Sequence, residues 1–261
     1  MISLIRLEND RMLIAPFFDS MDDVLVSSYL QGHMGEGWVD SIEGPSCAQI
    51  RLGDFSIVAG NYKSKEAAPM VMNIPEQPTN PWFLIIPQNE GWCKLIEECY
   101  PERSHKLTRY ALKKDTRFSL EKLQANVNKL DPQYSLASID KSLYGQCLRH
   151  SQLRDLCSHF LSAKDYVARG LGFCILHGKK VVCGASSYAV YDDGIEIEVD
   201  TIEDYRRQGL ATICASRLIL ECLQKGKYPK WDAASQKSLV LAEKLGYEFS
   251  HEYSAYAIEM T

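Results

Sequence analysis

The pattern of hydrophobic and polar positions is irregular in the first half of the chain and regular in the second. Apolar positions three and four apart predict helices, and short alternating or continuous apolar runs predict strands. The elements expected in the first half are a helix over 22–31, a loop over 31–37, a hairpin of 47–52 and 55–59 around Gly53-Asp54, an extended proline-rich segment over 69–81, a strand over 82–86, a helix over 92–99 and a strand over 105–112.

The second half gives the order strand, helix, helix, three strands, helix, strand, helix, strand. Serines at 162 and 235 are suited to cap helices, and Gly246 is suited to end one. The expected elements are a strand over 134–139, two helices within 141–169, strands over 172–176 and 181–189 around the turn 177–180, a strand over 195–201, a helix over 210–223, a strand over 230–233, a helix over 235–245 and a strand over 247–259.

This order predicts an α/β fold with a mixed sheet in the second half. Asp131-Pro132 breaks the chain before the regular region begins. We therefore expect a smaller α+β N-terminal domain over residues 1–130 and a second domain over residues 131–261. The strand 82–86 and the helix after it echo the layout of the second half, so the N-terminal domain is a candidate degenerate copy of that fold.

Composition is that of an ordinary globular protein. The 261 residues are 46% hydrophobic and 24% charged, with a net charge of -5. This balance excludes the basic face that nucleic-acid binding requires. The first ten residues lack the apolar stretch of a secretory signal, and no run approaches the about 18 apolar residues of a membrane span. We expect a cytoplasmic protein with no membrane partner.

The cysteines and histidines do not indicate a metal site. No Cys-x-x-Cys pair occurs, so buried free thiols in a reducing compartment are the simplest interpretation. A Cys-His nucleophile is an alternative, but no recognisable pair lies close in sequence. The residues concerned are Cys47, Cys93, Cys99, Cys147, Cys157, Cys174, Cys183, Cys214 and Cys222, and His33, His105, His150, His159, His177 and His251.

The most informative segment joins the strand 195–201 to the helix that follows it. Arg206, Arg207 and Gly209 lie directly before that helix. The unpaired N–H groups of a helix N-terminus point at an anion there, and the helix dipole adds favourable charge. Arginine suits phosphate oxygens. A ligand that contains a diphosphate is the natural fit, and a plain helix N-terminus beside a surface basic pair is the alternative.

The same turn resembles the Q/R-x-x-G-x-G/A motif of the GCN5-related N-acetyltransferases. Arg206, Gly209 and Ala211 occupy its three specified positions. The strand 195–199 before it is similar to the fourth strand of that family. The segment 231–247 is similar to the family's fifth strand and fourth helix.

That resemblance covers roughly residues 134–261. The family's Glu-Lys-Leu-Gly-Phe run is matched by residues 243–247. Tyr-Arg-x-x-Gly-Leu-Ala-Thr and Trp-Asp-Ala-Ala together resemble a narrower bacterial group, typified by the zwittermicin A resistance acetyltransferase. The resemblance implies a bound acetyl-coenzyme A. Its implied contacts are Val199 and Thr201 for the pantetheine arm, Arg206, Arg207, Gln208, Gly209, Leu210, Ala211 and Thr212 for the diphosphate, and Ser235 and Ser238 at positions near the cofactor.

Acetyl transfer to an amine requires the neutral amine. At a pKa near 10.4, only about 1 part in 2,500 is neutral at pH 7, so a base helps. Glu196, Glu198 and Asp200 alternate along one face of their strand, where carboxylates are costly to bury without a role or a partner. Glu196 and Glu198 are our candidates for base or amine anchor, and an ion-paired or exposed edge position is the open alternative.

The general acid of the family is absent at its usual place. Many members carry a tyrosine in the fourth helix, and the matching position here is Ala242. Tyr188 and Tyr205 are alternative acids, although a structural role suits both. A thiolate of pKa near 8.5 can leave without much help, so activity does not require that tyrosine.

Two functions remain in view at this point. The first is an N-acetyltransferase acting on the primary amine of a small molecule, such as an antibiotic or a polyamine. The second is a non-catalytic acyl-coenzyme A sensor or interaction protein. A homodimer is compatible with either function, and the acceptor is not determined by the sequence.

Overall fold

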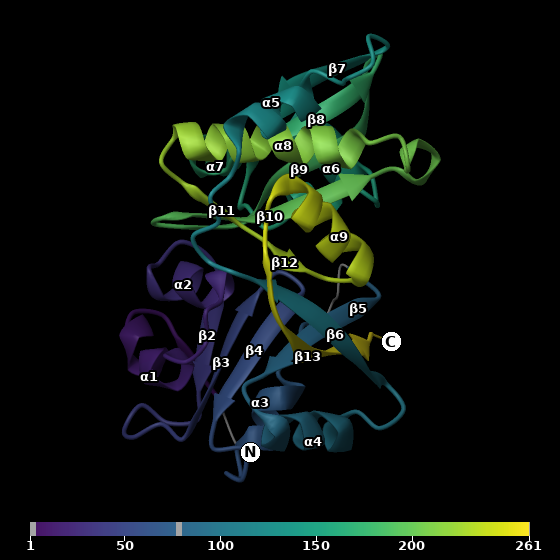
Figure 1. Cartoon of the computed structure of the whole chain (residues 1–261). Coiled ribbons are helices and arrows are strands. Elements are labelled where there is room, and N and C mark those ends of the chain that lie inside the picture. The colour runs from purple at the N-terminus through teal and green to yellow at the C-terminus, as the bar shows by residue number, and fades with distance from the viewer. Residues whose placement is uncertain (1–3, 77–79, 261) are drawn as a thin grey trace. The chain divides into compact units, whose positions relative to one another are not determined.

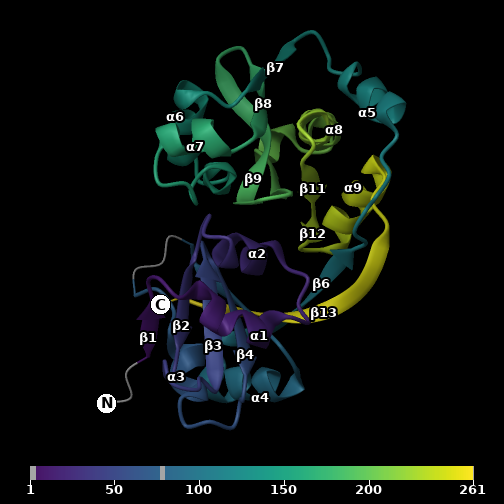
Figure 2. The same cartoon turned by 90° about the vertical axis from the view of Figure 1, so that its left-hand side faces the viewer.

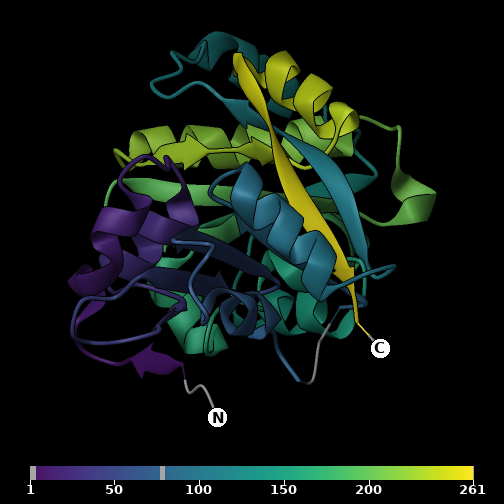
Figure 3. The same ribbon diagram turned by 90° about the horizontal axis from the view of Figure 1, so that it is seen from below.

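The computed structural model describes residues 4–76 and 80–260, and it divides the chain into two compact units. The N-terminal unit comprises residues up to Arg109 together with those from Tyr253 onward, and the C-terminal unit is Tyr110–Glu252. Strands β6 (Ser104–Leu112) and β13 (Phe249–Glu259) each contribute to both units, and they run beside each other (Figure 3).

The N-terminal unit contains one mixed sheet, and short helices lie between its strands along the chain. Its further elements are β1 (Ile5–Leu7), η1 (Arg11–Ile14), α1 (Ala15–Phe18), α2 (Val24–Leu30), β2 (Glu36–Val39), β3 (Cys47–Leu52), β4 (Phe55–Gly60), α3 (Ala67–Met72), β5 (Trp82–Pro87) and α4 (Glu90–Cys99) (Figure 1). The strands follow the order β1-β2-β3-β4-β5-β13-β6. Along this order β4 and β5 pair in parallel, whereas β1 with β2, β2 with β3, β3 with β4, and β5 with β13 pair antiparallel.

One face of this sheet forms a core under α3 and α4. Phe83 and Ile85 of β5 point into it, where they meet the fully buried Trp92 of α4. Because side chains alternate across a strand, Trp82 and Leu84 point to the opposite face. Asn89 caps α4 by accepting hydrogen bonds from the N–H groups of Gly91 and Trp92.

The C-terminal unit is a five-stranded sheet with helices on both faces. Its further elements are α5 (Leu120–Val127), β7 (Tyr134–Ser138), α6 (Lys141–Arg149), η2 (Arg154–Leu156), α7 (Ala163–Arg169), β8 (Gly172–His177), β9 (Lys180–Tyr191), β10 (Gly194–Thr201), η3 (Glu203–Tyr205), α8 (Leu210–Gln224), β11 (Tyr228–Lys230), β12 (Asp232–Ala233) and α9 (Gln236–Leu245). The strand order is β11-β10-β9-β8-β7. Helix α8 covers one face and α6 with α7 the other (Figure 2).

The two units share a layout. In the C-terminal unit, β10 is followed by α8, a parallel partner β11 and then α9. In the N-terminal unit, β4 is followed by α3, a parallel partner β5 and then α4. The mixed sheets confirm the predicted fold class, and the parallel pair in the first unit confirms the expected echo of the second.

Local signals placed most elements correctly. The hairpin around Gly53-Asp54 forms, Ser162 and Ser235 cap their helices, and Gly246 ends α9 in the left-handed region at φ 115°. The extended segment expected over 69–81 is wrong in its first part, because Pro69 lies in the first turn of α3, where its missing N–H costs nothing. Residues 77–79 of that segment lie outside the described residues.

The units do not meet at the expected boundary between residues 130 and 131. Helix α5, which the sequence pattern missed, packs against α8 and belongs to the C-terminal unit. Its Asn126 amide donates to the Ser216 hydroxyl of α8 at 3.2 Å. At the other end, residues 256–259 of β13 pair with β5 and belong to the N-terminal unit.

Candidate functional site

Strands β10 and β11 separate soon after they begin. Their parallel pairing runs only from Gly194 with Tyr228 to Glu196 with Lys230. On its other side, β10 stays paired with β9 as far as Thr201. The edge of β10 from Ile197 to Thr201 that faces β11 therefore has no strand partner in the part of the chain that is described. Backbone groups on such an edge are available to a ligand.

A β-bulge lies at the point of separation. Glu196 pairs with Ala189 and Ile197 with Ser187, which leaves Tyr188 as an extra residue in β9. The Tyr188 side chain is only 5% exposed, and its ring centroid lies 4.1 Å from that of His159. The structure thus places this candidate catalytic residue in packed surroundings.

Glu196 bridges the gap between the separating strands. Its side chain is buried, and Oε1 accepts a hydrogen bond from the backbone N–H of Asp232 at 2.7 Å. Asp232 lies just past the end of β11. A buried carboxylate that receives a backbone N–H at this distance makes a strong charge-assisted bond. The bond gives Glu196 a structural partner.

Glu198 and Asp200 follow Glu196 along β10 and are half-buried. Glu198 Oε1 accepts from the N–H of Val199 at 3.2 Å, so its carboxylate lies beside the free edge of the strand. Burial and, to a smaller extent, the neighbouring carboxylate of Asp155 raise the pKa of Asp200 to about 7, against the opposing effect of Arg206. The alternating pattern of β10 includes Asp200 but predicts no role for it.

A tight turn connects β10 to α8. In this turn the Tyr205 N–H donates to Ile202 O at 2.9 Å, and Arg206 Nε donates to Thr201 O at 3.1 Å. Arg207 has φ 63°, in the left-handed region that residues other than glycine rarely adopt. Gly209 has φ 79° and forms the N-cap of α8. Successive turns of this kind aim several N–H groups toward one side, as anion-binding nests do.

The N–H groups of residues 209–212 donate to no backbone carbonyl within the described part of the chain, and the first bond of α8 runs from Ile213 N–H to Gly209 O. Residues 206–209 are exposed. A Cβ added to Gly209 meets nothing within 4 Å, so open space lies beside the turn. The predicted diphosphate residues are therefore together and accessible, except for Leu210, whose side chain is buried.

An aromatic and basic cluster beside this turn was not anticipated. Tyr134 donates to Gln208 Oε1 at 2.8 Å, and Tyr205 OH lies 3.2 Å from His177 Nδ1. Lys180 lies over the Tyr205 ring at 5.4 Å. These residues come from β7, the β8–β9 hairpin and the turn, so only the sheet pairing brings them together.

The serines predicted near the cofactor have partners at the start of α9. Ser235 caps this helix by accepting from Ser238 N–H at 3.3 Å. The Ser238 hydroxyl accepts from Trp231 Nε1 at 3.1 Å. Ala242, at the place of the usual tyrosine, is fully buried in the same helix.

All nine cysteines are free thiols, and only Cys99 is more than marginally exposed. Among the described residues, no group of three or more His, Cys, Asp or Glu side chains is arranged to hold a metal ion. None of the described helices is both long and apolar enough to cross a membrane.

Comparison with known proteins gives consistent matches. A model of the GNAT acetyltransferase family matches residues 15–256. Over 97 residues the chain is 36% identical to the uncharacterized N-acetyltransferase YdfB of Bacillus subtilis, a match that covers 36% of this chain and 37% of that protein.

Solved structures extend the comparison to the whole fold. A GCN5-related N-acetyltransferase-like protein from Streptococcus suis superimposes with a TM-score of 0.89 at 40% identity, over 95% of this chain and 98% of that one. A tandem GNAT protein from the clavulanic acid biosynthesis pathway gives a TM-score of 0.56 at 12% identity over 98% of both chains. The second match shows the fold alone, and that fold has two halves.

Proposed function

This chain belongs to the GNAT acetyltransferase family, and we propose that it moves the acetyl group of acetyl-coenzyme A to the primary amine of a small molecule, an antibiotic or a polyamine being the first classes to test. The observation that carries this proposal is the edge of β10 without a strand partner, which leads to the turn before α8 and to the N–H groups of residues 209–212, which donate to no backbone carbonyl in the described chain.

The residues present fit coenzyme A. The N-terminus of α8 and the side chains of Arg206 and Arg207 suit its diphosphate. The carbonyl of Val199 and the backbone groups of Thr201 suit the amides of its pantetheine arm, because the edge of β10 there has no strand partner in the described chain, whereas the Val199 N–H donates to Glu198. When bound, the cofactor supplies the activated acetyl group and the thiolate that leaves.

Of the acidic candidates, Glu198 is the better base. Glu196 is buried and accepts from the Asp232 N–H, whereas Glu198 is half-buried and accepts from the Val199 N–H at the edge of β10 that has no strand partner in the described chain. In this scheme Glu198 accepts a proton from the substrate ammonium, directly or through a water molecule, and holds the amine in its neutral form. A positioned base contributes about 10²- to 10⁴-fold to such a step.

The test is incubation of the protein with acetyl-coenzyme A and a panel of amines that includes polyamines and aminated antibiotics. The free thiol that acetyl transfer releases is measured. We expect turnover with at least one amine and its loss in Glu198→Gln. Measured coenzyme A binding without turnover across the whole panel would contradict the transferase proposal.

That contrary outcome would favour the sensor function. The specific observation on its side is Ala242, which puts a buried methyl group where the family's usual acid stands. A sensor would bind coenzyme A with an affinity that Glu198→Gln leaves unchanged, and no amine would increase thiol release.

A further inference from the structure

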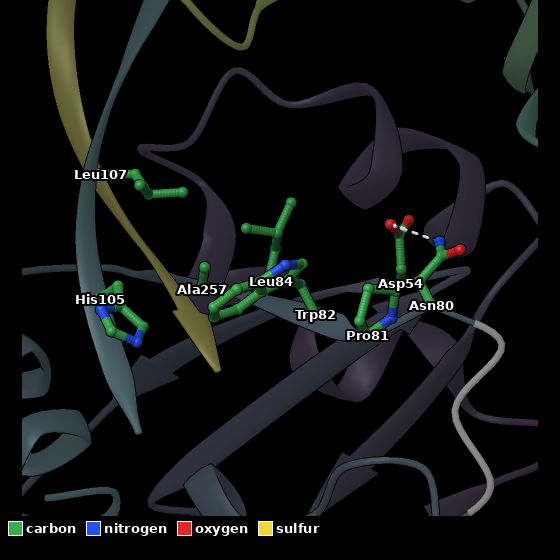
Figure 4. A pocket seen from close by; sticks show the side chains of 8 residues that line it. All are labelled: Asp54, Asn80, Pro81, Trp82, Leu84, His105, Leu107 and Ala257. Atoms are coloured by element: carbon green, nitrogen blue, oxygen red, sulfur yellow. Dashed lines mark hydrogen bonds between the residues drawn. The ribbon is translucent and has the colours of Figure 1, made fainter. Parts of the chain in front are cut away.

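The N-terminal unit has a cavity on the face of its sheet away from α3 and α4. Three neighbouring strands line it, with Trp82 and Leu84 from β5, Ala257 from β13 and Leu107 from β6 (Figure 4). Leu84 and Ala257 are register partners, which places their side chains on the same face. The cavity measures about 460 Å³, within the about 300 to 1,000 Å³ of small-molecule sites.

The lining presents apolar and aromatic surface. Trp82 is 42% exposed and Leu107 is 39% exposed, whereas Phe83, which follows Trp82 and points to the opposite face, is 2% exposed. The rings of Trp82 and His105 stand nearly perpendicular, with centroids 5.3 Å apart and an angle of 81° between their planes. Apolar surface gathered in a hollow indicates a binding site more strongly than the same residues scattered singly.

The carboxylate at one end of the cavity is already engaged. Asp54 is the only acidic side chain among the described residues that line the cavity. Its Oδ2 accepts a hydrogen bond from Asn80 Nδ2 at 3.2 Å (Figure 4), and the residue has at least one further interaction in the folded chain. A ligand therefore meets a paired carboxylate at this end, and a positive charge on the ligand has to compete with the partners that Asp54 has.

The cations of β6 do not line the cavity. Lys106 lies between two lining residues, and alternation turns it to the opposite face, where its ammonium is 5.9 Å from the Tyr256 ring centroid. Arg109 is buried, and its Nε donates to the Tyr253 hydroxyl at 3.2 Å. A negative charge on the ligand therefore gains no lysine or arginine contact from the described lining.

We propose that this cavity binds an uncharged aromatic small molecule, whose ring lies against Trp82 and Leu107. A neutral ring gains from the burial of apolar surface and from contact with the indole. An ion of either sign gives up its hydration on entry, which is costly unless a counter-charge replaces it. The site belongs to the N-terminal unit and needs no coenzyme A, so it goes beyond the proposed acetyl transfer.

The test is calorimetric titration of the full chain with three probes that share a phenyl ring and a three-carbon chain, namely 3-phenylpropan-1-ol, 3-phenylpropylamine and 3-phenylpropionate. The titrations are run at pH 8, at which free imidazole is mostly neutral. We expect the alcohol to bind about tenfold more tightly than either ion, because only the ions have a charge to desolvate.

Tryptophan fluorescence gives a second readout. Trp38, Trp92 and Trp231 are at most 8% exposed, so acrylamide should quench Trp82 first. Saturation with the alcohol should protect Trp82 from that quenching, whereas binding elsewhere on the chain would leave the quenching unchanged.

Variants of the lining locate the site. Trp82→Ala should weaken binding of the alcohol about tenfold, whereas Trp82→Phe keeps an aromatic ring and should stay within about threefold of the wild type. Leu107→Ala is a second, milder variant if Trp82→Ala unfolds.

Ile42→Ala is the control, since Ile42 is an exposed apolar side chain of the same unit outside the cavity, and it should leave binding unchanged. Glu198→Gln should also retain binding, which separates this site from the proposed acetylation site. Equal affinity for the three probes, no saturable binding of the alcohol, or an affinity that neither Trp82→Ala nor Leu107→Ala changes would overturn the proposal. A dimer that Trp82→Ala dissociates in sedimentation would also overturn it, because a second copy of the chain would then cover the cavity.

Discussion

The carboxylate of Glu196 accepts a hydrogen bond from the backbone N–H of Asp232 at the place where β10 and β11 separate. Glu196 is the last residue of β10 that pairs with β11, and Asp232 begins β12 beyond it. Their 2.7 Å hydrogen bond links the start of β12 to β10. This bond distinguishes Glu196 from Glu198, which the sequence pattern alone does not separate.

We expect Glu196→Ala to destabilise the protein. The substitution leaves the Asp232 N–H without its acceptor, and hydrogen bonds to charged groups contribute about 1.5 to 3 kcal/mol. Glu196→Gln keeps an acceptor oxygen of the same reach and should cost less than about half of that loss. Chemical denaturation of both variants measures the free energy of unfolding. Equal stability of Glu196→Ala and the wild type would show that the bond has no structural role.

Glu198→Gln should affect catalysis and not stability. We expect kcat for an accepted amine to fall by about 100-fold or more, while the affinity for coenzyme A stays within about twofold of the wild type. Raising the pH should partly restore the rate, because more of the amine is then neutral without a base. A variant with unchanged kcat would exclude Glu198 as the base.

Arg207→Gly should have opposite effects on folding and on binding. A residue other than glycine at φ 63° carries a backbone cost of about 1 to 2 kcal/mol, which glycine relieves. The same change removes a cation from the proposed diphosphate site. We therefore expect equal or higher thermal stability with weaker coenzyme A binding. Arg207→Lys is the matched control, since it keeps both the charge and the backbone cost.

Asp200 should make stability depend on pH in an unusual direction. Its pKa is raised from 3.8 to about 7 in the folded chain, so between these values the folded state holds a proton that the unfolded state has lost. The stability that Asp200 contributes is therefore present below about pH 4 and is lost as the pH rises to 7, at up to about 1.4 kcal/mol per pH unit.

Asp200→Asn removes this titration. Denaturation midpoints of the variant and the wild type, measured from pH 5 to pH 8, should differ increasingly up to about pH 7 and by a nearly constant amount above it, with the variant the more stable. Taking the difference cancels the histidines and other groups common to both proteins. A constant difference across the range would mean that Asp200 titrates normally.

The local elements of the site follow from sequence because their causes are local. Gly209 before an apolar helix, Ser235 at the start of α9 and Gly246 at its end are signals carried by a few neighbouring residues. The turn before α8 could be located in this way, and so could the carboxylates that alternate along β10. Helix α5 was not predicted because it is short and its stability depends on packing against α8.

The sequence by itself determined the order of elements, the turn before α8 and the family resemblance, since each depends on residues close together in the chain. Only the tertiary structure decided that Glu196 is tied to Asp232, that Tyr134 reaches Gln208, and that β13 pairs with β5. These contacts join residues far apart in sequence. Their energies depend on which strands become neighbours, and no local pattern of side chains specifies that choice.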